Sequence, residues 1–128
     1  MAKISKDTAT DVMAVDGYEG HFEDLGGYTV AYEAFTSDQD PAPLFRGLPG
    51  DHCQCPHWGV VTKGEMTYRY SDGTSETITA GEAYYAKPGH LPLFTAGTET
   101  IEFSPSDGLA ETVAVVTKNV EAMQAAQS

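Results

Sequence analysis

The sequence predicts an all-β domain followed by one C-terminal helix. Short runs rich in Val, Ile, Thr, Tyr and Phe recur at intervals of about ten residues, and turns that contain Gly or Pro separate them. Only the C-terminal segment replaces this alternation with apolar positions three and four residues apart. Many short strands of this kind are typical of a sandwich or barrel of antiparallel strands.

Residues 1–15 carry no clear period and are predicted to form an N-terminal arm, with the barrel over residues 16–104. Asp72-Gly73 is the strongest turn signal, because this dipeptide suits the left-handed backbone of a tight hairpin. The strands are expected at residues 19–24, 27–35, 57–62, 65–70, 74–79, 83–86, 91–95 and 98–103.

The helix is expected over residues 105–126, after capping residues at 104–107. Its apolar stripe consists of Leu109, Val113, Val116, Val120 and Met123. A single stripe predicts a helix that packs on the outside of the β domain or on a dimer partner.

Length and charge restrict the classes of function. The chain has 128 residues, 41% of them hydrophobic, which suits a single domain spanning residues 1–128. Its net charge of −12 disfavours nucleic-acid and membrane partners, because phosphates and anionic lipids repel it. The start of the chain lacks the apolar stretch of a signal peptide, so we expect a cytoplasmic protein.

The two cysteines are the most informative feature. Cys53 and Cys55 are separated by one residue, too close for an unstrained disulfide, and His52 and His57 lie beside them. In an extended strand, Cys53, Cys55 and His57 share one face. Thiolate and imidazole donors favour zinc, iron or copper over magnesium or calcium. The alternative is two ordinary buried thiols and a hydrogen-bonded core histidine, and Pro56 disturbs a regular strand here.

Residues 53–64 followed by 81–92 resemble the two-part signature of the cupins, small β-barrel proteins that bind metal inside the barrel. Gly64, Gly81 and Gly89 fit the frame of that signature. More specifically, Cys-Gln-Cys-Pro-His-Trp at 53–58 and Pro-Gly-His at 88–90 resemble a variant motif of small bacterial cupins. The resemblance implies a double-stranded β-helix, also called a jelly-roll barrel, with a metal site.

The sequence departs from the usual cupin ligands. His57 stands where a glutamate is usual, Cys53 where a histidine is usual, and Asp51 in place of the first histidine. In the second block Pro92 occupies the usual histidine position, whereas His90 shares its strand parity and can point the same way. The resemblance therefore implies a relocated metal site rather than none.

The predicted ligands of this site are Cys53, Cys55, His57 and His90, with Asp51 and His52 in reserve. The expected cofactor is a divalent transition metal, zinc or Fe(II). Four protein ligands predict a closed structural site, and three leave a position for water or substrate.

Aromatic residues accompany the predicted site. Tyr68 and Tyr84 are predicted to line a substrate pocket, with core packing as the alternative interpretation. Trp58 is expected to face outward, where it can anchor a dimer contact or pack on another sheet. Because the arm, exposed β edges and the apolar helical stripe are surfaces that a homodimer commonly buries, we expect a homodimer.

Two classes of function fit these patterns. The first is a metal-dependent enzyme, an oxygenase, isomerase or hydrolase, that acts on a small organic molecule inside the barrel. The second is a non-catalytic binding or redox-sensing module in which Cys and His hold a structural metal. A dry barrel without metal is the third interpretation.

Overall fold

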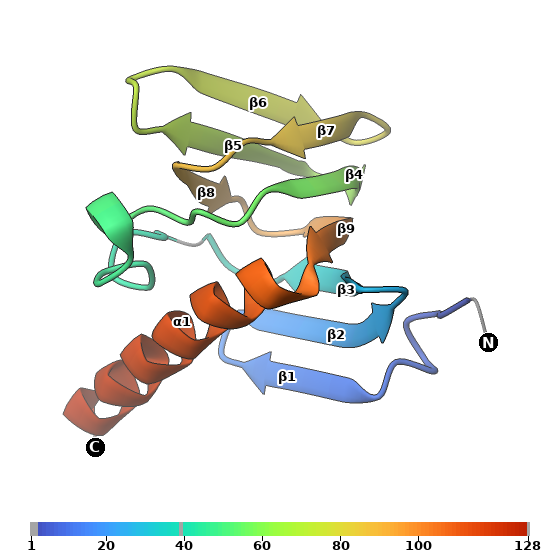
Figure 1. Cartoon of the computed structure of the whole chain (residues 1–128), viewed down its shortest axis with the longest axis horizontal. Coiled ribbons are helices and arrows are strands. Elements are labelled where there is room, and N and C mark those ends of the chain that lie inside the picture. The colour runs from blue at the N-terminus through green and yellow to red at the C-terminus, as the bar shows by residue number, and fades with distance from the viewer. Residues whose placement is uncertain (1–2, 39, 128) are drawn as a thin grey trace.

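The computed structural model describes residues 3–38 and 40–127, which form a β-barrel followed by one long helix (Figure 1). The strands are β1 (Asp11–Val15), β2 (Tyr18–Leu25), β3 (Tyr28–Phe35), β4 (His57–Lys63), β5 (Glu65–Tyr70), β6 (Ser75–Thr79), β7 (Ala83–Ala86), β8 (His90–Phe94) and β9 (Thr98–Pro105). The helical segments are the 3₁₀ turn η1 (Pro49–Asp51) and helix α1 (Ser106–Gln127).

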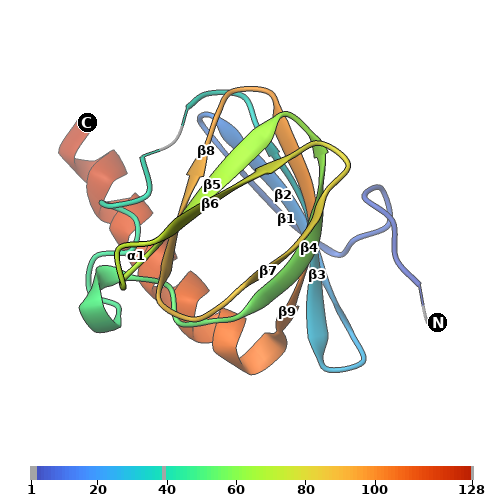
Figure 2. The same ribbon diagram turned by 90° about the horizontal axis from the view of Figure 1, so that it is seen from above.

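The strands form two antiparallel sheets. The larger sheet has the order β1-β2-β3-β9-β4-β7, and the smaller has the order β6-β5-β8. Figure 2 shows the two sheets facing each other around a common interior, with α1 outside. The prediction of an all-β barrel with a C-terminal helix is therefore confirmed.

The predicted arm of residues 1–15 needs a correction, because its last five residues form β1. This strand pairs with β2 from Asp11↔Phe22 to Val15↔Tyr18. Exposure alternates from Val12 to Val15, but all four of these residues are apolar and Val12 is 58% exposed, so the sequence itself shows no alternation of apolar and polar residues. Backbone pairing with β2 makes it a strand.

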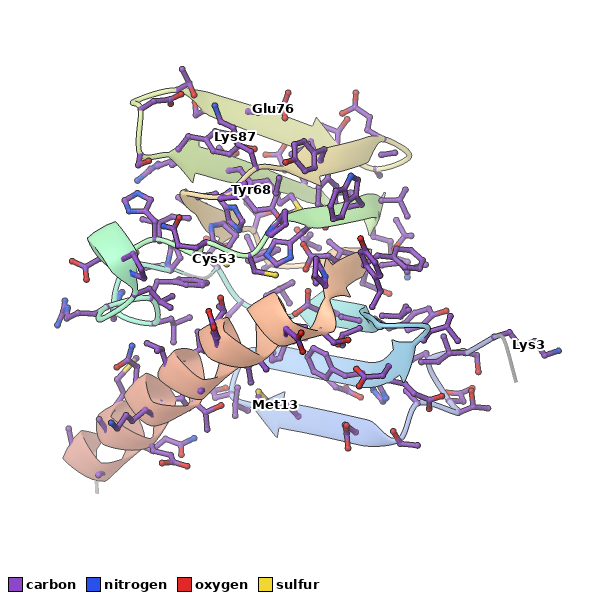
Figure 3. All side chains as sticks on the ribbon, viewed as in Figure 1. Lys3, Met13, Cys53, Tyr68, Glu76 and Lys87 are labelled. Atoms are coloured by element: carbon purple, nitrogen blue, oxygen red, sulfur yellow. The ribbon has the colours of Figure 1, made fainter. Side chains whose placement is uncertain are left out.

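The core lies between the two sheets, where inward residues of β4 to β7 meet. Met66 and Tyr68 of β5 are almost fully buried, as expected from their shared parity. The other members of this cluster are Val61, Ile78, Tyr84 and Ala86, with Tyr70 and Phe94 packed against it. Figure 3 shows Cys53 near the middle of the molecule, Glu76 at its upper edge and Lys3 at its N-terminal end.

Helix α1 packs across the loop that precedes β4. Asn119 Nδ2 donates to the carbonyl oxygens of Leu44 (2.7 Å) and Arg46 (2.9 Å). Closer to its start, Thr112 Oγ1 lies 3.5 Å from Cys53 Sγ, so the helix also covers the cysteine segment. None of the helical segments described has both the length and the apolar character that crossing a membrane requires.

Gly64, in the turn between β4 and β5, packs closely against Thr98, and an alanine substitution there tests this contact. Gly64 has φ of +73°, and a Cβ built there lies 2.8 Å from Thr98 Oγ1 and 2.9 Å from Thr98 Cα. Gly73, in the hairpin between β5 and β6, has φ of +89° but nothing within 4 Å of such a Cβ. We expect Gly73→Ala to cost roughly 1–2 kcal/mol of left-handed strain, and Gly64→Ala about 1–3 kcal/mol more from overpacking. Urea unfolding of both variants measures this difference, and equal losses would contradict it.

Candidate metal centre

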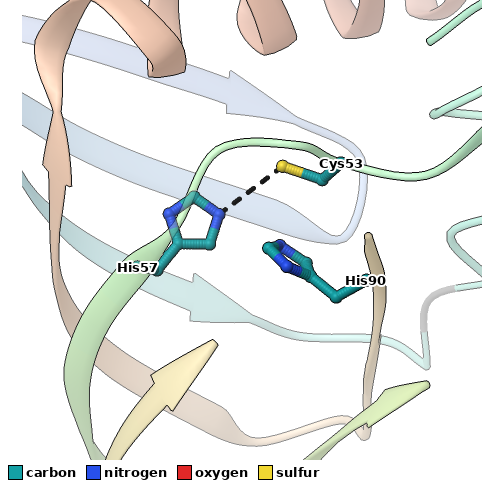
Figure 4. Close-up of side chains that lie close together, drawn as sticks. All are labelled: Cys53, His57 and His90. Carbon is teal, nitrogen blue, oxygen red and sulfur yellow. Dashed lines mark hydrogen bonds between the residues drawn. The ribbon is translucent and has the colours of Figure 1, made fainter. Parts of the chain in front are cut away.

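Cys53, His57 and His90 converge on one point inside the barrel (Figure 4). Their ligand atoms all lie within 4.8 Å of one another. Cys53 and His90 are held by backbone pairing: Cys53 N donates to His90 O (2.9 Å), and His90 N donates to Cys53 O (3.2 Å). His57 is the first residue of β4 and points inward, opposite in parity to the exposed Trp58. Three segments that are separate in the sequence thus contribute one donor each.

The spacing of these donors suits a bound transition metal. Cys53 Sγ lies 3.6 Å from His57 Nε2. In a tetrahedral site with metal–sulfur bonds of about 2.3 Å and metal–nitrogen bonds of about 2.05 Å, the two donors lie about 3.6 Å apart. No pair exceeds 4.8 Å, so shifts of about 1 Å complete the geometry. One thiol and two imidazoles are also the donor types that zinc and iron accept.

Each histidine has its second ring nitrogen anchored. His57 Nδ1 lies 2.7 Å from Ser104 Oγ, and His90 Nδ1 lies 2.6 Å from the carbonyl oxygen of Lys87. A metal on Nε2 requires the proton on Nδ1, which then donates to these oxygens. Such contacts fix the orientation of the ring and are typical of metal-binding histidines.

The protonation states of the donors follow from their burial. Burial lowers the pKa of His57 to about 4, and burial together with the nearby His57 lowers the pKa of His90 to about 4. Burial raises the pKa of the Cys53 thiol. At neutral pH both imidazoles are therefore neutral and able to bind metal, whereas a metal must displace the proton of Cys53.

Cys55, although predicted as a ligand, is not part of this cluster. Its Sγ lies 3.5 Å from the carbonyl oxygen of Pro56 and 3.9 Å from that of Pro105. A Cβ at Gly108 of α1 would lie 3.3 Å from that sulfur, so Cys55 faces the start of the helix. The expected alternation fails because β4 begins only at His57, after Pro56, which cannot donate to a strand ladder.

The two reserve ligands lie elsewhere as well. Asp51 has φ of 59°, and its Oδ1 accepts a hydrogen bond from Gly47 N (3.0 Å). His52 Nδ1 lies 2.6 Å from the carbonyl oxygen of Gly50. Both side chains stabilise the turn at η1, so the cluster consists of Cys53, His57 and His90.

Glu102, a residue that the sequence analysis did not single out, lies behind His57. Its Oε1 is 3.8 Å from His57 Nδ1, and its side chain is 12% exposed. Tyr68 OH and Tyr84 OH both donate to this same oxygen, at 3.0 and 3.1 Å. The two tyrosines predicted to line a pocket are thus buried and orient a carboxylate beside a candidate metal ligand.

Glu33 of β3 pairs with Glu102 in the interior. A side-chain hydrogen bond links the two carboxyl groups, and Tyr18 OH donates to Glu33 Oε2. Burial and the nearby Glu102 raise the pKa of Glu33 to about 8, and burial raises that of Glu102. Since Glu102 accepts from Tyr68 and Tyr84, we assign the charge to Glu102 and the shared proton to Glu33.

Comparison with solved structures identifies the fold. Similar folds include a protein of unknown function from Rhizobium leguminosarum bv. viciae 3841, with a TM-score of 0.57 and 17% identity over 81% of this chain and 95% of that one. An RmlC-like cupin from Shewanella frigidimarina NCIMB 400 has a TM-score of 0.52 and 16% identity over 75% and 84%. No protein-family model and no curated protein sequence matches.

A further similar structure is the Fe(II) form of HppE, with a TM-score of 0.54 and 12% identity over 79% of this chain and 58% of that one. This chain therefore spans just over half the length of that protein. These likenesses establish the cupin fold, as the resemblance in the sequence predicted. The barrel also contains a Cys/His/His group that can hold a metal ion.

Proposed function

We propose that this protein is a metal-dependent cupin enzyme that acts on a small organic molecule. The observation that carries the proposal is the convergence of three donors, Cys53, His57 and His90, without a fourth ligand from Cys55. Three protein ligands leave a coordination position for water or substrate, the arrangement of catalytic rather than structural zinc sites. Zinc and Fe(II) both suit the donors, and the similar HppE structure is an Fe(II) form.

A bound metal would supply a Lewis acid and a coordination position for substrate. The surrounding residues have separate tasks. Ser104 and the carbonyl of Lys87 hold the imidazoles in orientation. Glu102 stabilises positive charge that builds up at His57, and Glu33 stores a proton nearby. Cys53 and His90 are each 1% exposed, so bulk solvent does not reach these donors, and entry of a substrate would require movement of the segment before β4.

The burial of the donors also favours a second candidate, a structural metal. Cys53 belongs to the segment before β4, contacts Thr112 of α1 and pairs with His90 of β8. A metal there would fasten the loop and the helix to the barrel without turnover. The two free thiols suit the reducing cytoplasm under either candidate.

Metal content is the first test. We expect untagged protein purified without added metal to contain about one equivalent of zinc or iron by elemental analysis. Cys53→Ser should lose the metal, because it removes the only sulfur donor of the cluster. Cys55→Ser is the matched control, a second buried cysteine that should retain the metal. Metal-free wild-type protein, or equal loss in both variants, would overturn the proposed ligands.

Cobalt substitution separates the two candidates. Co(II) bound by Cys53 should give a thiolate-to-cobalt charge-transfer band that is absent in Cys53→Ser. If a coordination position is open, added azide should change the cobalt d–d bands of the wild-type protein. A spectrum that azide leaves unchanged identifies a closed site, and the structural candidate then replaces the enzyme.

A further inference from the structure

The outer face of the larger sheet carries an uncharged row across four strands. The register aligns Val30 of β3 with Phe103 of β9, Phe103 with Trp58 of β4, and Trp58 with Tyr85 of β7. Residues directly opposite each other in antiparallel strands share a face. The four side chains therefore form one continuous row on the side of the barrel that faces away from β5, β6 and β8 (Figure 2).

A second uncharged row runs beside the first. Tyr32 is aligned with Ile101, Ile101 with Val60, and Val60 with Ala83. An antiparallel sheet with one face in water normally alternates apolar and polar residues. Here neither row contains a charged residue, although 20% of the chain is charged. This pattern is typical of a sheet covered on both faces.

The aromatic members of this face are exposed. Trp58 is 41% exposed, Tyr85 50%, Phe103 42% and the neighbouring Tyr28 42%. The ring of Trp58 lies 5.2 Å from that of Tyr85 and 6.1 Å from that of Tyr28, measured between centroids. At roughly 200 Å² for each side chain, these four expose about 350 Å² of aromatic surface. A patch of this size is in the range of the largest apolar patch on a protein surface, about 300–600 Å², which is often functional.

We propose that this aromatic face is the interface between two copies of this chain. Two faces of about 350 Å² supply about 700 Å² of aromatic surface, nearly half of the roughly 1,600 Å² of a standard interface. A flat sheet face can pack on its own copy about a two-fold axis, because the same patch serves both subunits. The face belongs to the same barrel as the metal centre, but the proposal does not depend on metal.

Charge favours a second copy as the occupant. The chain has 19 acidic and 7 basic residues, so contacts elsewhere between two copies bring carboxylates together. The two rows contain no acidic residue. Two residues before Ile101 on β9, and on the same face, the carboxylate of Glu99 forms an ion pair with Lys63, with 3.2 Å between Oε2 and Nζ. At Tyr32 the chain itself covers part of the face, since Tyr32 OH donates to Ile4 O (3.2 Å), and Val30 is only 1% exposed. The open part of the face therefore consists of Phe103, Trp58, Tyr85 and Tyr28.

Sedimentation tests the proposal with a matched control variant on α1. We expect wild-type protein to sediment at twice its mass of 13.7 kDa. Trp58→Glu should weaken dimerisation at least about 100-fold, because a carboxylate then enters a desolvated aromatic contact on both sides. Met123→Glu on α1 replaces an exposed apolar residue away from this face and should leave the dimer intact.

The single tryptophan provides a readout that needs no variant. On dilution of the wild-type protein, Trp58 fluorescence should shift to the red and become more easily quenched by acrylamide, at the concentrations where the dimer dissociates. A dimer that survives Trp58→Glu overturns the proposal, as does dissociation by Met123→Glu alone. A wild-type monomer at every concentration also overturns it and assigns the face to a different partner.

Discussion

Removal of bound metal is expected to lower the melting temperature of the protein by at least about 10 °C. Cys53, His57 and His90 come from three separate segments, and the unfolded chain does not hold them together. Metal at roughly 1,000 times its dissociation constant therefore stabilises the fold by about 4 kcal/mol. For a domain of this length, each kcal/mol corresponds to roughly 3–5 °C. Calorimetry before and after treatment with a chelator, and again after metal is restored, measures the shift.

Two variants show whether this stabilisation arises at the proposed site. His90→Ala should melt at the same temperature with and without the chelator, since it leaves two donors of the cluster. Cys55→Ser should respond to the chelator as the wild-type protein does, because its thiol faces α1. A shift that persists in His90→Ala would place the metal elsewhere.

Much of the fold could be predicted from local pattern. The alternation of Met66 and Tyr68 indicated the buried face of β5, and Asp72-Gly73 indicated the hairpin to β6. Alternation reports which face a residue shares with its neighbours, and this holds within regular strands. It missed β1, whose residues are strand-forming only because β2 lies beside them.

The candidate site was predictable only in part, because alternation indicates the direction of a side chain only within a regular strand. His57 and His90 lie in strands, where parity indicates direction, and both point inward. Cys53 and Cys55 precede β4 in an irregular segment, so equal parity did not give them equal direction. Cys53 is oriented by its bridge to His90, a contact between residues far apart in the sequence.

The pairing of Glu33 with Glu102 could not be predicted from the local sequence pattern. Glu33 has the parity of the buried Phe35, which was a usable signal, but a glutamate in a strand more often faces water. What retains Glu33 and Glu102 inside is their mutual hydrogen bond and the hydroxyl groups of Tyr18, Tyr68 and Tyr84. These five residues come from five strands and meet only in the folded barrel.

The carboxyl pair has a consequence for stability between pH 6.5 and 8. The pKa of Glu33 rises from its usual 4.5 to about 8 in the folded protein, so the folded state binds the proton more tightly than the unfolded state. The stabilisation from this proton is complete below about pH 4.5 and is lost as the pH rises towards 8. Up to about pH 7.5 the two histidines act in the opposite direction, because their pKa values are lowered to about 4 in the folded protein, whereas unfolded imidazoles with a pKa of about 6.5 still take up protons. Comparison with Glu33→Gln, which retains both histidines, therefore isolates the contribution of the carboxyl groups.

Urea unfolding of metal-free protein across this window should show that the wild-type protein loses roughly 1.5–2 kcal/mol of stability relative to Glu33→Gln. Glu33→Gln should not show this decline, because the amide keeps the hydrogen bond to Glu102 but has no proton to lose, and only the smaller opposite trend from the histidines should remain. Glu76→Gln, at an exposed glutamate of β6, should retain the wild-type slope. If Glu33→Gln keeps that slope, the titrating proton does not reside on Glu33. If the stability of the wild-type protein does not decline with pH, the two carboxyl groups do not share a proton in the folded protein. Loss of a shared proton would leave two buried negative charges, and these must destabilise the barrel that encloses them.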